Sequence, residues 1–312
     1  GSSLKFDDFK DKQRFTHAVV IPTLLKNGYT EKAEKLKWCG RVKSIVICED
    51  CKTAYFNGAN SCKDRFCPIC QKKRSLLWLA KLFPIFENLI NKGYYINFVT
   101  LTVKDTKKLS TSLDLLNNAF RYIQHEDKTM RKQFNELYIG GIRSLEIKTG
   151  ENSKLWHPHL HMLVVKNKKS NFKDDLAFLR PAWIKSLRMV GSKEEHPGNV
   201  DIQSLRIDNR FKKESLIKAI CECFKYLTKS SWKNEVEDIC EMIDTLTNVR
   251  SLNSWGNIKY YLAKQKAEAQ IDKEMDMGEI ELKHHVCKFC GCDRFDVIEG
   301  IYSSHLLVHD FE

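Results

Sequence analysis

The sequence predicts an α+β fold that carries small cysteine-rich modules. Three observations support this prediction: segments that alternate apolar and polar residues, segments with helical spacing of apolar residues, and cysteines in close pairs. The expected strands are residues 96–103, 138–148, 156–165 and 200–207, and the expected helices are residues 71–91, 109–137, 176–189, 214–230 and 233–250. A chain of 312 residues is long enough for one sizeable core with satellite modules.

The composition is that of a basic, folded protein. Hydrophobic residues make up 42% of the chain, and its formal net charge is +12. A positive surplus of this size suits a polyanion, of which nucleic acid is the commonest. There is no run of about 18 uncharged apolar residues, so we expect no membrane span. The sequence also starts without a signal-peptide pattern, so we expect a cytoplasmic protein.

The first cysteine-rich module is predicted at residues 36–75, after an N-terminal arm at residues 1–35 to which we assign no chemistry. Two CxxC pairs lie fifteen residues apart in this module, a spacing typical of a four-thiolate zinc site. The candidate ligands are Cys48, Cys51, Cys67 and Cys70. Two further cysteines, Cys39 and Cys62, leave the exact ligand set open. Such a site most often has a structural role.

A second cysteine module is predicted at residues 284–312, after an acidic and polar linker at residues 267–283. A CxxC pair precedes an HxxxH pair by fourteen residues, which is typical of a Cys2His2 zinc site. The candidate ligands are Cys287, Cys290, His305 and His309, with Cys292 as an alternative. The residues between the first module and the linker, 76–266, form the predicted main domain.

Within the main domain, the strand at residues 138–148 and the strand at residues 156–165 are joined by a short polar turn. We therefore expect a β-hairpin. Glu146 stands on the polar face of the first strand and would lie beside the second. The earlier strand at residues 96–103 also has one polar face, which carries Thr100 and Thr102.

The second hairpin strand carries three histidines at alternate positions, His157, His159 and His161. Alternate residues of a strand point to one face, so the three imidazoles would lie together. Two imidazoles on a rigid strand form a preformed chelate for a divalent metal. A half-buried strand that carries its histidines by chance is the alternative, and three histidines on one face make it less favoured. Glu146 is a candidate further ligand.

The helix at residues 214–230 carries a polar stripe opposite its apolar face. Glu222, Tyr226 and Lys229 form this stripe at spacings of four and three residues. A surface tyrosine with flanking ion pairs is the plainer interpretation, but beside a histidine strand we favour a catalytic tyrosine. Candidate DNA-binding residues are Thr100, Thr102, Lys166, Lys168 and Lys169.

Three sequence blocks occur in a fixed order along the chain: Phe98-Val99-Thr100-Leu101-Thr102, His157-Pro158-His159-Leu160-His161 and Lys225-Tyr226-Leu227-Thr228-Lys229. This arrangement resembles the HUH endonucleases and, among them, the rolling-circle replication initiators of small bacterial plasmids. In relaxases of the same superfamily the tyrosine precedes the histidines, whereas here it follows them. The resemblance covers residues 48–259 and leaves out the C-terminal module.

The resemblance implies a central antiparallel sheet flanked by helices. It further implies that His159 and His161 bind Mg²⁺ or Mn²⁺, with Glu146 or His157 completing the site. We favour Glu146, because a hard cation prefers a carboxylate, and we expect the tighter binding with Mn²⁺. Tyr226 would then attack single-stranded origin DNA, leaving a 5′-phosphotyrosine and a free 3′-OH that primes a polymerase.

The remaining polar residues of the helix receive roles in the same scheme. Lys229 would stabilise the developing charge, and Glu222 would act as a general base for water in a second cleavage. Tyr261 repeats the tyrosine-x-x-lysine spacing but lacks an acid one turn earlier, so Tyr226 is the favoured nucleophile.

The expected partners are single-stranded and hairpin origin DNA, a host helicase and a polymerase, while the oligomeric state stays open. Two alternative functions are a single-strand DNA transposase of related design and a zinc-containing DNA-binding protein without catalysis.

Overall fold

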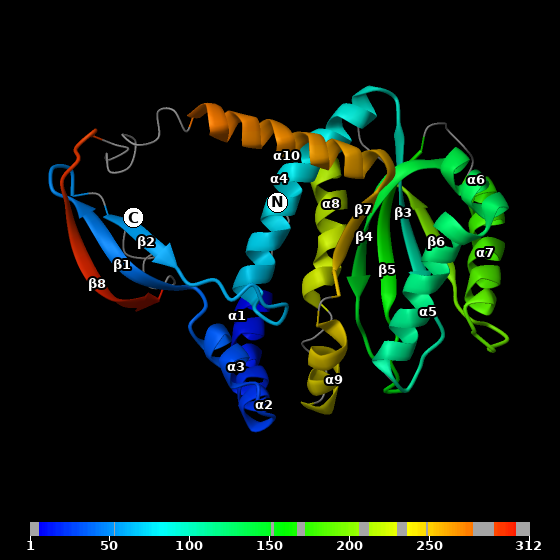
Figure 1. Cartoon of the computed structure of the whole chain (residues 1–312), viewed down its shortest axis with the longest axis horizontal. Helices are drawn as coiled ribbons and strands as arrows, with labels where there is room; N and C mark the ends of the chain where they lie inside the picture. Colours follow the sequence, from blue (N-terminus) through cyan, green and yellow to red (C-terminus); the bar gives the residue numbers. More distant parts are fainter. Residues whose placement is uncertain are drawn as a thin grey trace. The chain divides into compact units, whose positions relative to one another are not determined.

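The computed structural model describes residues 6–52, 54–150, 153–166, 172–205, 212–229, 236–247, 249–276 and 290–303 (Figure 1). The chain divides into two compact units, one made of residues 1–71 with 265–312 and the other of residues 72–264. None of the helices in these described ranges is long and apolar enough to span a membrane.

The larger unit is built on a five-stranded antiparallel sheet in the order β6-β3-β5-β4-β7. Its strands are β3 (Tyr95–Thr102), β4 (Tyr138–Glu146), β5 (His159–Lys166), β6 (Val200–Ser204) and β7 (Leu252–Trp255). Its helices are α5 (Leu109–Arg121), the π-helical turn η2 (Tyr122–Glu126), α6 (Lys128–Leu137), α7 (Phe172–Met189), α8 (Lys212–Lys229) and α9 (Val236–Leu246), with most of α4 (Pro68–Asn91) and the start of α10 (Gly256–Asp276). The predicted α+β class is confirmed.

The strand register brings the polar residues of three strands to one region. β5 lies between β3 and β4, and His161 is paired with Thr100 on one side and with Ser144 on the other. His159 is likewise opposite Thr102 on β3 and Glu146 on β4. The predicted hairpin of β4 and β5 is therefore confirmed, and it places Glu146 beside the histidines.

Helices α4 and α8 pack on the face of the sheet to which these histidines belong. The core on this face contains Leu163 and Val165, which have the same parity along β5 as His159 and His161. The other members are contributed mainly by α4 and α8: Leu82, Ile85, Phe86, Leu89, Ile96, Ile142, Leu216, Ile220, Cys223 and Ile258. In Figure 1, α5, α6 and α7 lie on the other side of the sheet from α8. The histidine strand and α8 thus share one layer of the unit.

A pair of glycines lets β7 approach β4 closely. A Cβ atom on Gly141 would lie 2.5 Å from the carbonyl oxygen of Leu163 and 2.6 Å from the Trp255 ring. A Cβ atom on Gly140 would lie 2.8 Å from the carbonyl oxygen of Trp255. Side chains at either position would push the strands apart, so glycine is required here.

Two expected helices differ from the observed ones. The helix expected over residues 109–137 is divided, because Asp127 caps the N-terminus of α6: its carboxylate accepts hydrogen bonds from the backbone N–H groups of Thr129 and Met130. The helix expected over residues 71–91 begins three residues earlier in the structure, and α4 contains Pro84 in its interior.

The smaller unit combines helices from the N-terminal part with a three-stranded antiparallel sheet in the order β2-β1-β8. Its elements are α1 (Phe6–Phe15), η1 (Thr16–Val20), α2 (Ile21–Lys26), α3 (Thr30–Lys37), β1 (Arg41–Cys48), β2 (Ala54–Ala59) and β8 (Phe295–Ser303). The two cysteine modules were predicted as separate, but β8 pairs with β1 along its whole length. In addition, α10 continues to Asp276, into the predicted linker at residues 267–283.

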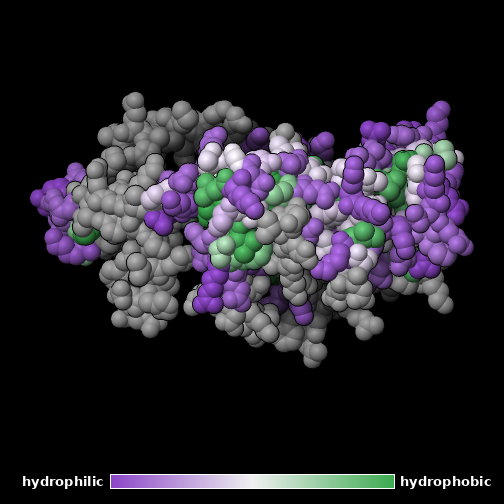
Figure 2. All heavy atoms as spheres, turned by 90° about the horizontal axis from the view of Figure 1, so that it is seen from below, coloured by the Kyte–Doolittle hydropathy of each residue, from purple (hydrophilic) through white to green (hydrophobic). Residues whose placement is uncertain are grey.

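The surface shown in Figure 2 is largely hydrophilic, with smaller apolar patches between the polar side chains. Exposed large apolar residues in the described ranges include Leu76 and Leu77 of α4 and Tyr260 of α10.

Candidate active site

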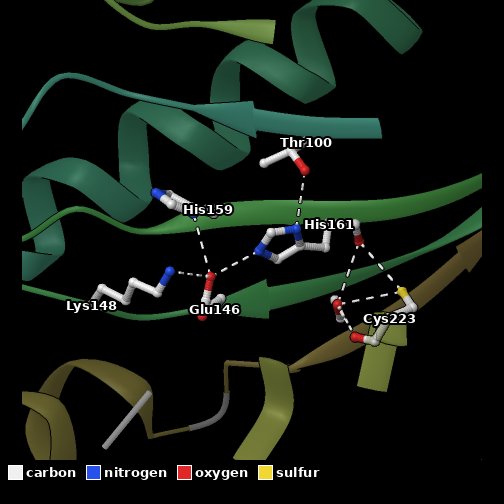
Figure 3. Close-up of polar contacts among 7 residues, drawn as sticks. Thr100, Glu146, Lys148, His159, His161 and Cys223 are labelled. Atoms are coloured by element: carbon white, nitrogen blue, oxygen red, sulfur yellow. Dashed lines mark hydrogen bonds and ion pairs between the residues drawn. The ribbon is translucent and has the colours of Figure 1, made fainter. Parts of the chain in front are cut away.

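Glu146, His159 and His161 converge on one point between β4 and β5 (Figure 3). The Nε2 atom of His161 lies 2.8 Å from Oε2 of Glu146, and Nδ1 of His159 lies 3.3 Å from the same oxygen. The register explains this convergence, since Glu146 is opposite His159 and His161 is two residues further along the same face. One ligand atom from each residue lies within 4.8 Å of the others.

A hydrogen bond from β3 orients the inner histidine. Oγ1 of Thr100 lies 3.1 Å from Nδ1 of His161, on the opposite side of the ring from Nε2. The ring of Phe98 stacks on the same imidazole with a centroid separation of 5.7 Å. With Nδ1 held by a hydroxyl, Nε2 faces Glu146 and is the nitrogen available as a ligand.

The carboxyl group of Glu146 is fully buried yet favours its charged form. Burial alone would raise its pKa, but hydrogen bonds from His159 and His161 and the positive charge of Lys148 lower it more, so the pKa falls to about 2. Nζ of Lys148 lies 3.2 Å from Oε2 of Glu146. The site therefore holds a buried carboxylate with cationic and hydrogen-bonding partners on one of its oxygens.

The residues present fit a divalent metal. Oε1 of Glu146 and Nε2 of His159 are buried and make no hydrogen bond within the described part of the chain. A buried polar atom without a partner costs about 1–3 kcal/mol, so these atoms have capacity for a further ligand. Two imidazoles and one carboxylate suit Mn²⁺ better than Mg²⁺, which prefers oxygen ligands throughout.

His157 lies outside this group. Its Nδ1 atom contacts Oδ1 of Asp105 at 2.5 Å, and Oδ2 of the same carboxylate accepts a hydrogen bond from Ser153 at 3.0 Å. Burial and the charge of His159 lower the pKa of His157, and Asp105 opposes this shift. The expectation that all three histidines share a strand was wrong, because β5 begins only after Pro158, which has no backbone N–H to donate.

A hydrogen bond joins helix α8 to the sheet beside this site. The hydroxyl of Ser144 donates a hydrogen bond to the carbonyl oxygen of Cys223 at 2.7 Å. Ser144 precedes Glu146 by two residues on the same face of β4. Ile220 and Leu216, one and two turns earlier on α8, belong to the core that includes Ile142 of β4.

The predicted catalytic stripe begins at the same point of α8. The backbone of Tyr226 follows Cys223 by three residues, or about 4.5 Å of helix rise. The structure describes the helical backbone of Glu222, Tyr226 and Lys229 but not their side chains. Their catalytic roles therefore stay predictions.

The structure contradicts one predicted DNA contact. Lys166 is only 2% exposed, and its ammonium group pairs with the buried carboxylate of Asp175, so it is not available to a phosphate. The hydroxyl of Thr102 accepts a hydrogen bond from the backbone N–H of Asn199 at 3.0 Å, and Thr100 contacts His161. Lys168 and Lys169 lie outside the described residues.

The cysteine pairs are grouped differently from the predicted zinc sites. Cys67 and Cys70 lie with Cys39 and Cys62, whereas Cys48 and Cys51 lie with Cys290. The single group of Cys48, Cys51, Cys67 and Cys70 was therefore wrong, because the first pair lies at the β1 end that adjoins β8 and the second pair begins α4. Cys287, His305 and His309 fall outside the described residues, and Cys292 belongs to neither group.

Sequence reasoning gave no role to Lys148, Ser144 or Cys223. Lys148 and Ser144 have the parity of Glu146 along the chain, so the period of two places both on its face of the strand but does not reveal what they contact. The contact of Ser144 with α8 depends on the packing of a helix that is 79 residues away in sequence. No local pattern reports such a contact.

Comparison with known proteins identifies the family. A family model described as Replication protein matches residues 53–288. The chain belongs to this replication protein family. The membership confirms the resemblance to the replication initiators of plasmids that the three sequence blocks indicated.

Curated relatives agree with this membership. A protein named Protein rep from Lactiplantibacillus plantarum is 30% identical over 70% of this chain and 68% of the relative. A second Protein rep, from Streptococcus pneumoniae serotype 2, is 27% identical over 81% of this chain and 75% of the relative. A third, from Staphylococcus aureus, is 28% identical over 62% of this chain and 80% of the relative. No solved structure matches the chain.

Proposed function

We propose that this replication protein nicks and rejoins single-stranded DNA at a plasmid origin, with Tyr226 as the nucleophile. One observation carries the proposal: the group of Glu146, His159 and His161 lies on the sheet face against which α8 packs, and Ser144 fastens α8 next to that group. A nucleophile on α8 and a metal held by the strands would then act on one phosphate.

Glu146, His159 and His161 would hold Mn²⁺ or Mg²⁺. A divalent cation bound there supplies Lewis-acid polarisation of the scissile phosphate. The chain prepares the ligands in advance, because Thr100 orients His161 and the low pKa of Glu146 keeps its carboxylate charged at neutral pH.

In the nicking step the Tyr226 oxygen attacks the phosphorus in line. A bond forms between the phenolic oxygen and phosphorus, and the bond from phosphorus to the 3′ oxygen breaks. The tyrosine hydroxyl gives up its proton, and the leaving oxygen gains one to become a free 3′-OH. The products are a 5′-phosphotyrosine on the protein and a primer end for a polymerase.

Glu222 and Lys229 flank the nucleophile on α8 at i−4 and i+3. Lys229 would hold the phosphate and stabilise its developing charge. Glu222 would take a proton from water in a second cleavage that ends a replication round, a contribution typically worth about 10²–10⁴-fold. The partners in this scheme are single-stranded and hairpin origin DNA, a host helicase and a polymerase.

The transposase alternative uses the same chemistry, and the family match favours replication over it. The non-catalytic alternative is disfavoured by the buried ligand group, since a DNA-binding protein without catalysis has no need for an orphaned Glu146 oxygen beside two histidines.

The test is formation of a covalent adduct with a single-stranded oligonucleotide library in Mn²⁺, followed on denaturing gels. Wild-type protein should give the adduct, and His161→Ala should suppress it with the nucleophile still in place. Tyr226→Phe should abolish it while DNA affinity persists, and Tyr261→Phe is the matched control that should behave as wild type. An adduct in Tyr226→Phe together with none in Tyr261→Phe would reassign the nucleophile.

A further inference from the structure

The smaller unit contains four cysteines whose sulfur atoms form a compact group. Sγ of Cys39 lies 3.4 Å from Sγ of Cys70 and 3.4 Å from Sγ of Cys67, and Sγ of Cys62 lies 3.6 Å from that of Cys70. All four sulfurs lie within 4.8 Å of one another. Three of these cysteines are buried and Cys62 is half-buried.

These distances match the edges of a tetrahedron around one metal ion. Four thiolates at the usual zinc–sulfur length of about 2.3 Å are separated by about 3.8 Å. A disulfide would bring two sulfurs to about 2.0 Å, and no disulfide joins the described cysteines. The spacing therefore suits a mononuclear tetrahedral site.

Backbone amides point at the same sulfurs. The N–H groups of Cys62 and Lys63 donate to Cys39 at 3.4 Å and to Cys70 at 3.3 Å, and those of Asp64 and Cys70 donate to Cys62 and Cys67 at 3.4 and 3.5 Å. Hydrogen bonds to sulfur favour the charged thiolate, which is the form that binds metal. Lys63 adopts a left-handed φ of 56°, which turns the chain tightly around the group.

A bound metal ion would stabilise the segment that carries Cys62. Residues 60–67 contain neither helix nor strand. The contacts that hold them in the smaller unit include the Thr16 hydroxyl on the carbonyl oxygen of Phe66 at 3.1 Å and an ion pair between Lys32 and Asp64 at 3.3 Å. A metal that binds Cys39, Cys62 and the first turn of α4 would fix this loop between α3 and α4.

We propose that Cys39, Cys62, Cys67 and Cys70 form a four-thiolate structural zinc site that fixes the loop at residues 60–67 to the start of α4. The site is independent of the metal site at Glu146, whose nitrogen and oxygen ligands suit a harder cation. It is also separate from the group of Cys48, Cys51 and Cys290, so the two CxxC pairs of the N-terminal module belong to different sulfur groups.

Metal analysis of full-length variants tests the ligand set. Cys62→Ser should lower the zinc content by one ion per chain relative to wild type. Cys51→Ser is the matched control from the other CxxC pair. In Cys51→Ser, replacement of zinc by Co²⁺ should still give the thiolate-to-cobalt charge-transfer absorption of a four-thiolate site. A zinc content of Cys62→Ser equal to that of wild type would overturn the proposal. Loss of the four-thiolate cobalt absorption in Cys51→Ser as well as in Cys62→Ser would also overturn it. Iron in place of zinc would overturn the identity of the metal.

A measurement on wild-type protein avoids any folding defect of the variants. Cys62 and Cys240 are both half-buried, but only Cys62 belongs to the sulfur group. Alkylation followed by peptide mass spectrometry should label Cys240 and leave Cys62 protected until a chelator removes zinc. Equal labelling of the two residues in the zinc-loaded protein would contradict the proposed ligation.

Discussion

At the scale of single residues, the candidate active site depends on Glu146 and on the two ring nitrogens that face it. A carboxylate with no exposed surface would ordinarily be neutral, but here two histidines and Lys148 keep it charged. A bound cation would take over the role of these partners. Glu146 is therefore already charged, as the proposed metal site requires.

The hydrogen bond between Thr100 and His161 should affect metal affinity directly. Thr100→Val keeps the shape of the side chain but removes the hydroxyl 3.1 Å from Nδ1. We expect Mn²⁺ affinity to fall about 10- to 100-fold, the usual effect of losing a partner of a metal-binding histidine. Isothermal titration calorimetry measures this change.

Thr102→Val is the matched control on the same strand. The Thr102 hydroxyl accepts from the backbone N–H of Asn199 instead of contacting the ligand group, so Mn²⁺ affinity should stay near the wild-type value. Equal losses in the two variants would mean that Thr100 supports the strand and does not orient His161.

The lowered pKa of Glu146 predicts how the stability of the metal-free protein changes with pH. The folded pKa is about 2 against an ordinary 4.5, so the charged carboxylate stabilises the fold above pH 4.5 and loses this contribution as the pH falls toward 2. The difference corresponds to roughly 3 kcal/mol. Urea unfolding of Glu146→Gln with EDTA should show a weaker loss of stability over this range. A pH dependence identical to that of wild type would contradict the charged state assigned to Glu146.

Much of the arrangement around Glu146 could be predicted from the alternation of side chains along a strand. The proximity of Glu146 to His159 and His161 could be predicted, because a hairpin with alternating faces leaves little choice of register. The pairing of His157 with Asp105 could not, because Asp105 lies 52 positions earlier and β5 begins only after Pro158. The burial of Lys166 likewise depends on Asp175, whose position no strand pattern reveals.

At the scale of elements, the contact of α8 with β4 determines where the proposed nucleophile stands. The Ser144 hydroxyl joins the strand to the Cys223 carbonyl, one helical turn before Tyr226. Ser144→Ala should slow adduct formation while leaving Mn²⁺ affinity unchanged, because it loosens the helix and removes no ligand. Rapid-quench kinetics at saturating Mn²⁺ measures the rate.

Ser186→Ala provides a control for general loss of stability. Ser186 is also buried and its hydroxyl also donates to a helix carbonyl, that of Trp183, but it lies on α7. Each variant should lose about 0.5–1.5 kcal/mol of stability. Only Ser144→Ala should slow nicking. If both variants slow it equally, the Ser144 contact has no special part in positioning α8.

The elements themselves were predictable where apolar periodicity was strong. β3, β4, β5 and α8 were all expected near their observed bounds, whereas the helix over residues 109–137 was predicted as one piece. The helix is interrupted because the Asp127 side chain hydrogen-bonds the backbone at the start of α6. The spacing of apolar residues does not reveal such a cap. The continuation of α10 into an acidic segment shows that polar composition alone does not exclude a helix.

At the scale of the whole molecule, residues from both ends of the chain build the smaller unit. β8 pairs with β1, and Cys290 lies 3.5 Å from Cys48, 242 positions earlier. Spacing rules for zinc motifs group cysteines that are near in sequence, so they could not predict this pairing. The CxxC pairs could be recognised in the sequence, but the groups that their sulfurs form depend on the fold.

The separation into two units predicts separable effects of their ligand groups. Cys290→Ser removes a ligand candidate from the smaller unit and leaves Glu146, His159 and His161 in the larger one intact. We expect nicking of a short single-stranded oligonucleotide to continue at the wild-type rate, while thermal unfolding of the smaller unit shifts to lower temperature. Loss of nicking by Cys290→Ser would show that the larger unit does not carry the activity alone.

In the proposed mechanism Tyr226, on the helix that packs against the sheet face of Glu146, His159 and His161, becomes covalently linked to DNA. The most direct measurement is to digest the adduct formed by wild-type protein in Mn²⁺ with protease and nuclease and to locate the modified residue by mass spectrometry. We expect a 5′-nucleotide on the Tyr226 peptide and unmodified Tyr260 and Tyr261. A nucleotide on either of those tyrosines, with Tyr226 unmodified, would contradict it.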